Sequence, residues 1–434
     1  MPKTIVMVHG YSVRSLSAYG QFPALFVSEG FTTADIELSA FDSLDNSVTC
    51  DDLAAALEEQ VAALEARGLD VADAAFVVHS TGAIIVRRWM LNRLEKGQAQ
   101  PSHFVSLAGA NHGSTLAQLG VSILNRLRGT LQGADGVGQQ VLNDLDYGSA
   151  FLRALNREWL TAFNAGRLKK TFLFSMIGDY HKDLVDQLFW QTKENGSDTT
   201  VRICGGNLNY TWISADPDAI PPVFVPEVMN AQVPHLVLAG ICHTGDHGII
   251  DSVRAAADAP FAAVMDALRV VDDPSYAAVG AKWAAVTSAW NAQNPNDCSS
   301  LLIFRLTDES ERPITDSLIL LTDSNGATGA GTDVLQAHQP IQNQVDGSVV
   351  SFYVLSDAFS GGNVCNVQIA PKSGSPLVDY RTVDYDATAN AMTIVQPNET
   401  TYIDVEVKRD VSKTYQIVNY STNPDINKQW PPLP

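Results

Sequence analysis

A serine that follows an apolar strand and opens a helix is the first residue whose position suggests chemistry. The apolar run that ends at His79 is followed directly by Ser80, Thr81 and Gly82. A serine hydroxyl attacks a carbonyl only when it is exposed, has a base beside it and has donors for the resulting oxyanion. A sharp strand-to-helix turn provides the exposure and aims the Thr81 amide at that oxyanion. The position therefore predicts a nucleophile at Ser80.

The local motif leaves a second interpretation open. The usual nucleophile pattern is Gly-x-Ser-x-Gly, and here Val78 stands where the first glycine belongs. A β-branched residue must then fit a crowded turn. Taken alone, the motif fits a serine that merely caps the helix as well as a nucleophile. The partners of Ser80 must decide between the two.

Two histidines could serve as the base, and three carboxylates could orient it. His243 and His247 both lie in the loop 242–248, directly after the apolar run from 235 to 241. A carboxylate that binds the far side of the imidazole stabilises its protonated form. Asp179, Asp183 and Asp198 precede this loop. For Asp198 the structural alternative is a surface turn held by its own side chain. His243 comes first after the strand, and this order favours it.

Strands and helices alternate along the first 290 residues or so. The helix at about 53–64 has one apolar stripe, with Thr49 as its predicted N-cap, and further helices are expected at about 81–96 and 249–270. This alternation predicts an α/β fold with a doubly wound, mainly parallel sheet. The expected strands cover Lys3–Val8, Ala34–Phe41, Ala74–His79, His103–Ala108, Thr171–Ile177 and His235–Ile241.

Residues 114–168 interrupt the alternation, because no strand pattern occurs there. Leucines and Ile123 between Leu116 and Leu131 lie on one helical face, and a second amphipathic helix is predicted at 149–163. We expect a helical cap inserted over the sheet. Two ordinary helices packed on the core are the alternative.

The residue pattern of the sequence changes near residue 297. From Cys298 onward, short β-rich runs are separated by Asp-, Gly-, Ser- and Asn-rich turns, which predicts a β-sandwich. The expected domains are therefore 1–293 and 298–434. The candidate strands are Leu301–Leu306, Leu318–Thr322, Val349–Leu355, Val364–Ala370, Met392–Val395, Tyr402–Val407 and Tyr415–Val418.

The chain order Ser80, Asp198, His243 is that of α/β-hydrolases. Over residues 2–268 the chain resembles bacterial lipases and their esterase relatives in that superfamily. The stretches that carry the resemblance are Val8-His9-Gly10-Tyr11, His79-Ser80-Thr81-Gly82 and Ala108-Gly109-Ala110-Asn111-His112-Gly113-Ser114.

The resemblance implies roles for individual residues. The polar flanks of Asp198 are similar to the acid loop of lipases, and His243-Thr244-Gly245 is similar to their histidine loop. The Tyr11 amide would join the Thr81 amide in the oxyanion hole, with His9 as a structural residue that bonds the loop. His112 comes too early in the chain for the base, and we expect it to be structural.

The expected function is hydrolysis of carboxylic esters, by a lipase or esterase acting on acyl lipids through an acyl-enzyme. No metal or organic cofactor is required. A phospholipase, a thioesterase or an acyltransferase would use the same triad. The alternative of another class is a non-catalytic lipid- or carbohydrate-binding protein in which the C-terminal sandwich is the working part.

Composition limits the partners and the location. The formal net charge of -20 disfavours nucleic acid and anionic membrane surfaces. No run approaches the ~20 apolar residues that would span a bilayer. Peripheral contact with a lipid surface stays open, and the sequence does not define the oligomeric state. The N-terminus shows no signal peptide, which predicts a cytoplasmic protein, or a secreted one if a leader was removed.

Five sparse cysteines form neither a disulfide framework nor a zinc pattern. Cys298 and Cys365 lie in the same domain and could pair. Three aspartates in turns of the sandwich would suit calcium, although acidic turns are usually just solvated. These are Asp308, Asp323 and Asp333.

Overall fold

The computed structural model describes most of the 434 residues. The described residues are all except 14–15, 40, 115–116, 118–135, 180–195, 217–222, 246, 251–258, 324–339, 356–364, 374–377, 387–395 and 411–434. None of the described helices is long and apolar enough to cross a membrane.

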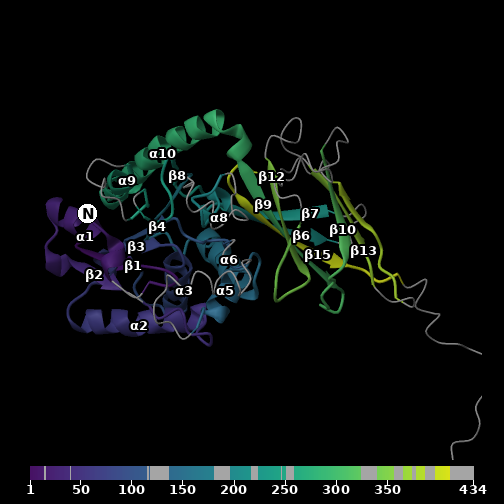
Figure 1. Cartoon of the computed structure of the whole chain (residues 1–434), viewed down its shortest axis with the longest axis horizontal. Coiled ribbons are helices and arrows are strands. Elements are labelled where there is room, and N and C mark those ends of the chain that lie inside the picture. Colours follow the sequence, from purple (N-terminus) through teal and green to yellow (C-terminus); the bar gives the residue numbers. More distant parts are fainter. Residues whose placement is uncertain are drawn as a thin grey trace, which may run out of the picture.

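A six-stranded, fully parallel sheet forms the centre of the N-terminal half, on the left of Figure 1. Every residue of β3 and β4 is buried, as the continuous apolar runs predict for strands covered on both faces. The expected doubly wound sheet is confirmed. In spatial order its strands are β2 (Ile36–Ser39), β1 (Thr4–Val8), β3 (Ala74–His79), β4 (His103–Leu107), β5 (Phe172–Gly178) and β8 (His235–Leu238).

Helices cover both faces of this sheet. One core cluster joins α1 (Phe22–Ser28), α9 (Ala259–Leu268) and α10 (Asp273–Gln293) to the sheet. The other joins α2 (Cys50–Ala66), α3 (Gly82–Glu95), α5 (Gln139–Leu145) and α6 (Ala150–Asn164). Thr49 caps α2 through a capping box with Asp52, as the sequence predicts.

The described part of the predicted helical insertion packs on the core. The side chains of Leu152, Leu155 and Trp159 in α6 are completely buried in the cluster that also contains α3. Ser149 caps α6 by accepting the Leu152 amide. The predicted leucine-rich face lies outside the described residues.

The C-terminal half is a sandwich of two sheets, on the right of Figure 1. Isoleucines, leucines, valines and phenylalanines from both sheets fill the space between them, as alternating strands require. The expected sandwich is confirmed, and the candidates Met392–Val395 and Tyr415–Val418 lie outside the described residues. One sheet contains β10 (Ser317–Asp323), β13 (Cys365–Pro371) and β14 (Val383–Asp386); the other contains β11 (Ile341–Gln342), β12 (Val349–Leu355), β9 (Ser299–Asp308), β15 (Thr400–Val407), β6 (Tyr210–Asp216) and β7 (Val223–Val228).

The last two strands of the larger sheet, β6 and β7, come from within the predicted N-terminal domain 1–293. β6 runs parallel to β15 and pairs with it from Tyr210 opposite Thr400 to Ser214 opposite Asp404. β7 then continues the sheet as an antiparallel neighbour of β6. Sequence analysis does not anticipate this hairpin. It ties the sandwich to the segment between the predicted acid and histidine loops.

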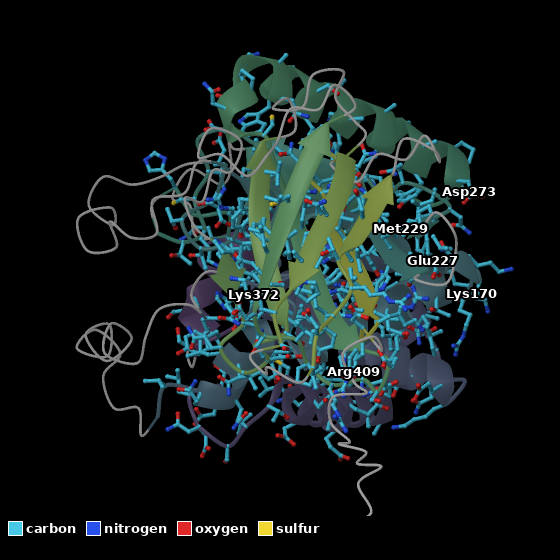
Figure 2. The ribbon with its side chains drawn as sticks, turned by 90° about the vertical axis from the view of Figure 1, so that its right-hand side faces the viewer. Lys170, Glu227, Met229, Asp273, Lys372 and Arg409 are labelled. Carbon is cyan, nitrogen blue, oxygen red and sulfur yellow. The ribbon has the colours of Figure 1, made fainter. Side chains whose placement is uncertain are left out.

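The central strands β9 and β15 of the larger sheet are largely buried on both faces. The rings of Trp212 and Tyr402 stack at 4.6 Å, and the Arg153 guanidinium lies over Trp212. Arg153 also forms an ion pair with Asp404. Figure 2 shows these strands in front of the helices of the N-terminal half. The two halves therefore share one continuous core rather than meeting at a small surface.

Among the candidate disulfide cysteines and calcium-binding aspartates, Cys298 and Asp308 have protein partners. Cys298 is a free cysteine whose thiol lies 3.4 Å from the Asn294 carbonyl, so it is not paired with Cys365. Asp308 accepts two backbone amides and forms an ion pair with Arg409 at 2.9 Å. The side chains of Asp323 and Asp333 lie outside the described residues.

Candidate active site

Ser80 lies at a strained turn between β3 and α3. Its φ of 56° falls in the left-handed region, which is costly for a residue with a side chain. The turn is fixed by its own backbone, because the Ser80 amide donates to Leu107 and the Ser80 carbonyl accepts from Ala83 and Ala110. This is the geometry that exposes a nucleophile at the carboxyl edge of a parallel sheet.

Two glycines permit the loop after β1 to lie against this turn. A Cβ on Gly10 would come within 2.6 Å of the Thr81 amide nitrogen and 3.0 Å of Ser80 Cβ. A Cβ on Gly82 would lie 2.6 Å from the Val8 carbonyl oxygen. Only glycine fits such approaches. The backbone at residue 10 therefore lies beside the Thr81 amide.

Val78, the departure from the usual motif, causes no crowding at the turn. It is fully buried within β3, where it pairs with Val8 on one side and Ser106 on the other. Tyr11, the second predicted oxyanion donor, follows Gly10 directly. Its hydroxyl donates to the Val137 carbonyl at 2.5 Å, which fixes the loop. The oxyanion role of the Tyr11 and Thr81 amides stays a prediction.

Asp198 and His243 lie together, as predicted from their loops. Asp198 Oδ2 is 2.8 Å from His243 Nδ1, and the His243 amide donates to the Asp198 carbonyl at 2.8 Å. The carboxylate is completely buried, and His243 is 5% exposed. Two bonds to one residue fix both the position and the ring orientation of His243.

The loop of Asp198 explains why this acid is held so firmly. Asp198 Oδ1 accepts the amides of Thr200 and Val201, and the Asp198 amide donates to the Val201 carbonyl. Thr199 has a φ of 87°. Sequence analysis offered two interpretations of Asp198, a turn held by its side chain and an acid that orients a histidine. The structure shows both kinds of contact: one carboxylate oxygen closes the turn, and the other binds His243.

Two further imidazoles stand in a row with His243. The ring centroids of His9 and His79 are 4.6 Å apart, and those of His79 and His243 are 4.6 Å apart. Burial, together with the nearby charge of His243, lowers the pKa of His9 to about 3 and that of His79 well below its usual value. Both therefore stay neutral beside His243. His9 Nδ1 accepts the Gly10 amide at 2.8 Å, the structural role that the sequence suggested.

The other candidates for the acid and the base make different contacts or lie outside the described residues. The Asp179 carboxylate accepts the amide of Gly240 and the indole N–H of Trp290. The His247 carbonyl accepts the Cys242 amide, and its side chain is half-buried. His112 lies 3.1 Å from the Tyr402 hydroxyl and 2.9 Å from the Asn207 carbonyl, in agreement with a structural role. Asp183 lies outside the described residues.

A buried polar cluster around Arg87, in the helix that follows the Ser80 turn, is a feature that sequence analysis missed. Arg87 of α3 is completely buried, donates to Asn156 at 2.8 Å and lies 4.6 Å over the ring of Trp159. Asn156 Nδ2 also donates to the Asn111 carbonyl and to the Tyr402 hydroxyl. An arginine in a helix gives no sequence signal of this kind, because the other members of the cluster come from three separate segments.

The fold of the whole chain is similar to that of a solved phospholipase. Phospholipase PlaB from Legionella pneumophila matches with a TM-score of 0.82 and 25% sequence identity, over 97% of this chain and 96% of that chain. The same enzyme in complex with thio-NAD matches with a TM-score of 0.80 and 25% identity.

Other similar structures cover less of the chain. The mature form of the Bacillus licheniformis lipase BlEst2 matches at 20% identity over 48% of this chain and 79% of that chain, with a TM-score of 0.34. No family model matches the sequence, and no curated protein matches it either. The likeness to the phospholipase structure agrees with the lipase and esterase resemblance of the sequence.

Proposed function

We propose that this α/β-hydrolase of the lipase and esterase type cleaves carboxylic esters of lipids, with Ser80 as nucleophile, His243 as base and Asp198 as the orienting acid. The observation that carries the proposal is the 2.8 Å contact between Asp198 and His243. The strained turn at Ser80 supports it. Ser80 follows directly after His79, whose ring centroid lies 4.6 Å from that of His243, so the strained turn and the buried acid–histidine pair belong to one region of the molecule.

The mechanism that follows is two-step acyl transfer. His243 Nε2 accepts the Ser80 hydroxyl proton as Ser80 Oγ attacks the ester carbonyl, while Asp198 stabilises the imidazolium. The amides of Thr81 and Tyr11 would bind the oxyanion, and one such donor typically lowers the barrier by about 3 kcal/mol. The alcohol leaves with the proton from His243. Water, activated by His243, then releases the acid from Ser80.

A phospholipid is the substrate that we favour among acyl esters. A solved structure that matches nearly the whole chain is that of a phospholipase. Thioesters and transfer to an acceptor alcohol use the same acyl-enzyme, so they are the competing activities. The net charge of -20 supports zwitterionic rather than anionic lipid as the first choice.

The test compares three substrates on the purified chain: phosphatidylcholine vesicles, a triacylglycerol emulsion and a long-chain acyl thioester. We expect fatty acid release to be fastest from phosphatidylcholine and to fall by about 10⁴-fold or more in Ser80→Ala. Ser28→Ala, which changes an exposed serine of α1, is the control and should keep full activity. Activity confined to acetyl esters, or unchanged in Ser80→Ala, would contradict the proposal.

A further inference from the structure

A short hairpin of residues 196–203, which we call the acid hairpin, carries Asp198. Two backbone hydrogen bonds close it: the Asp198 amide donates to the Val201 carbonyl at 3.1 Å, and the Ile203 amide donates to the Gly196 carbonyl at 2.9 Å. A two-stranded hairpin of this size has little stability of its own. The position of Asp198 therefore depends on what the acid hairpin contacts.

On one side, the acid hairpin contacts the candidate active site. Asp198 Oδ2 lies 2.8 Å from His243 Nδ1, and the Asp198 carbonyl accepts the His243 amide at 2.8 Å. The Thr200 carbonyl accepts the Ser114 hydroxyl at 2.7 Å, from the segment that follows β4. Ser80 is held separately, by hydrogen bonds of its backbone. A displacement of the acid hairpin would therefore move the acid and the histidine relative to the serine.

On its other side, the acid hairpin lies against the larger sheet of the sandwich. The Arg202 guanidinium lies over the ring of Tyr353 in β12, with Cζ 3.7 Å from the ring centroid. Arg202 is 5% exposed, and Tyr353 is completely buried. A cation–π contact becomes stronger when water is excluded from it. Because Arg202 precedes the last residue of the acid hairpin, this contact holds the hairpin at its base.

Two more contacts join the acid hairpin and the segment after it to the sandwich. The Thr400 hydroxyl of β15 donates to the Cys204 carbonyl at 3.0 Å. A Cβ on Gly196 would lie 2.1 Å from the Asp297 carbonyl oxygen, so the hairpin begins directly against the segment that leads into β9. Figure 1 shows the short helix α8 (Ile203–Gly206), which continues the hairpin, next to β9. The C-terminal half thus contacts both ends of the acid hairpin.

The face of β12 that contacts the acid hairpin is not the face that fills the sandwich. Tyr353 belongs to the core cluster that contains α2, α3 and α6, whereas the adjacent Phe352 belongs to the core between the two sheets. Phe352 packs edge to face on Phe304, with 5.8 Å between the ring centroids. Successive residues of a strand point to opposite faces. The rings of Tyr353 and Phe352 are therefore adjacent in the chain but lie in different cores.

We propose that Tyr353 is a positioning residue of the candidate active site: its ring holds Arg202, and Arg202 holds the acid hairpin that places Asp198 against His243. The inference rests on the proposed function of the triad, and it gives the sandwich a task in that function. Tyr353 acts here through Arg202 and the backbone of the hairpin. A displacement of reacting groups by about 1 Å can lower a rate by about 10²-fold.

The test uses three variants of the full chain, with one soluble ester as substrate. Tyr353→Leu should lower kcat by about tenfold or more and change KM by less than about threefold. Tyr353→Phe keeps the ring face beside Arg202, so kcat should stay within about threefold of the wild type. Phe352→Leu is the matched control, because it removes a ring from the next position of the same strand. It should lower the melting temperature about as much as Tyr353→Leu does, and keep kcat within about threefold.

A spectroscopic measurement tests the position of Asp198 without turnover. An ionised carboxylate only accepts, so His243 Nδ1 carries the proton of its contact with Asp198. A ring proton held in such a bond gives an NMR resonance far downfield of the backbone amides, and its loss in Asp198→Ala assigns it. With isotope-labelled histidine, the wild type, Tyr353→Phe and Phe352→Leu should show this resonance. Tyr353→Leu should lose it.

Arg202→Met breaks the same contact from the other side, and it decides the case if Tyr353→Leu does not fold. It should lower kcat by about tenfold or more and remove the His243 resonance. In the double variant, Tyr353→Leu should lower kcat by no more than about twofold beyond Arg202→Met, because both changes remove one interaction.

An unchanged kcat or an unchanged His243 resonance in Tyr353→Leu would overturn the proposal. An equal loss of kcat in Phe352→Leu would also overturn it, since the effect would then be one of stability. A wild-type chain that cleaves no ester would contradict the proposed function instead. In that case the His243 resonance still decides whether Tyr353 holds Asp198 in place.

Discussion

His79 holds the main chain of His243: its Nε2 lies 3.2 Å from the His243 carbonyl oxygen. A carbonyl only accepts, so Nε2 carries the ring proton. Nδ1 of His79 is buried without a partner among the described residues. The residue just before the proposed nucleophile thus anchors the loop of the proposed base, and so one strand end positions two members of the candidate triad.

The first prediction concerns this bond. His79→Phe keeps the ring beside His243 but removes the donor, so the His243 loop should lose its anchor and kcat should fall about tenfold, the equivalent of ~1.4 kcal/mol. KM should change little. The matched control is His103→Phe, because His103 Nε2 also lies 2.9 Å from a carbonyl, that of Val270, far from the site. Equal loss of kcat in both variants would mean that the effect is on stability alone.

The second prediction separates the two histidines of the loop. His243→Ala should lower kcat by about 10⁴-fold or more, because the base is lost. His247→Ala should keep activity within about threefold, since the contact of His247 with Cys242 uses its backbone carbonyl. Steady-state rates on one soluble ester decide between them. The reverse result would assign the base to His247.

The third prediction tests the oxyanion loop. Gly10→Ala should lower kcat by roughly 10²–10³-fold, because its Cβ would lie 2.6 Å from the Thr81 nitrogen and displace a predicted donor. Gly205→Ala is the control, since its Cβ would meet nothing closer than 3.5 Å. Pre-steady-state acylation of Ser80 is the measurement. Normal acylation in Gly10→Ala would remove this loop from the catalytic machinery.

The fourth prediction is a loss of stability in acid. The pKa values of buried His9, His112 and His235 are each lowered to about 3, chiefly by burial. The unfolded chain binds these protons near pH 6.5 and the folded chain does not. The free energy of unfolding should therefore fall as the pH drops below about 6.5, by up to about 1.4 kcal/mol per pH unit for each histidine.

Urea unfolding at pH 7, 6 and 5 checks this prediction. His112→Phe should reduce the slope of stability against pH, whatever its effect on stability at pH 7. A free energy of unfolding that stays constant from pH 7 to pH 5 would contradict it.

The fifth prediction is that the N-terminal half does not fold by itself. A chain that ends at Asp297 would leave β6 without β15 and would expose Trp212, which stacks on Tyr402 in the intact protein. We expect circular dichroism and gel filtration of this fragment to show an unfolded or aggregated species. Tyr402→Ala in the full chain should cost about 3–5 kcal/mol by opening a cavity at the same place. A soluble, active fragment would contradict the shared core.

The sequence was sufficient for features that depend on local patterns. The buried runs of β3 and β4 predicted the parallel sheet, and the Asp198 and His243 loops follow strands that a parallel sheet brings to one edge. Val78 looked unfavourable because the motif has a glycine at this position, where the turn is expected to be crowded. In the structure its side chain belongs to the core of β3 and not to the turn.

The β6–β7 hairpin and the Arg87 cluster could not be predicted in the same way. The segment 210–216 carries no periodic signal strong enough to reveal that it pairs with β15. Arg87 looks like an ordinary polar position of a helix, and its burial depends on Asn156, Trp159 and Tyr402, which lie far away in the chain. Such contacts come from topology, which a single sequence does not show.

The pairing of β6 with β15 also has a consequence during synthesis. Trp212 and Asp404, which share a hydrogen bond across these strands, are 192 residues apart in the chain. At about 5–20 residues per second, a ribosome needs roughly 10–40 s to deliver the partner of β6. Throughout that interval an apolar strand with an unpaired edge is exposed to the cell, which makes it a target for chaperones and a starting point for misassembly between nascent chains.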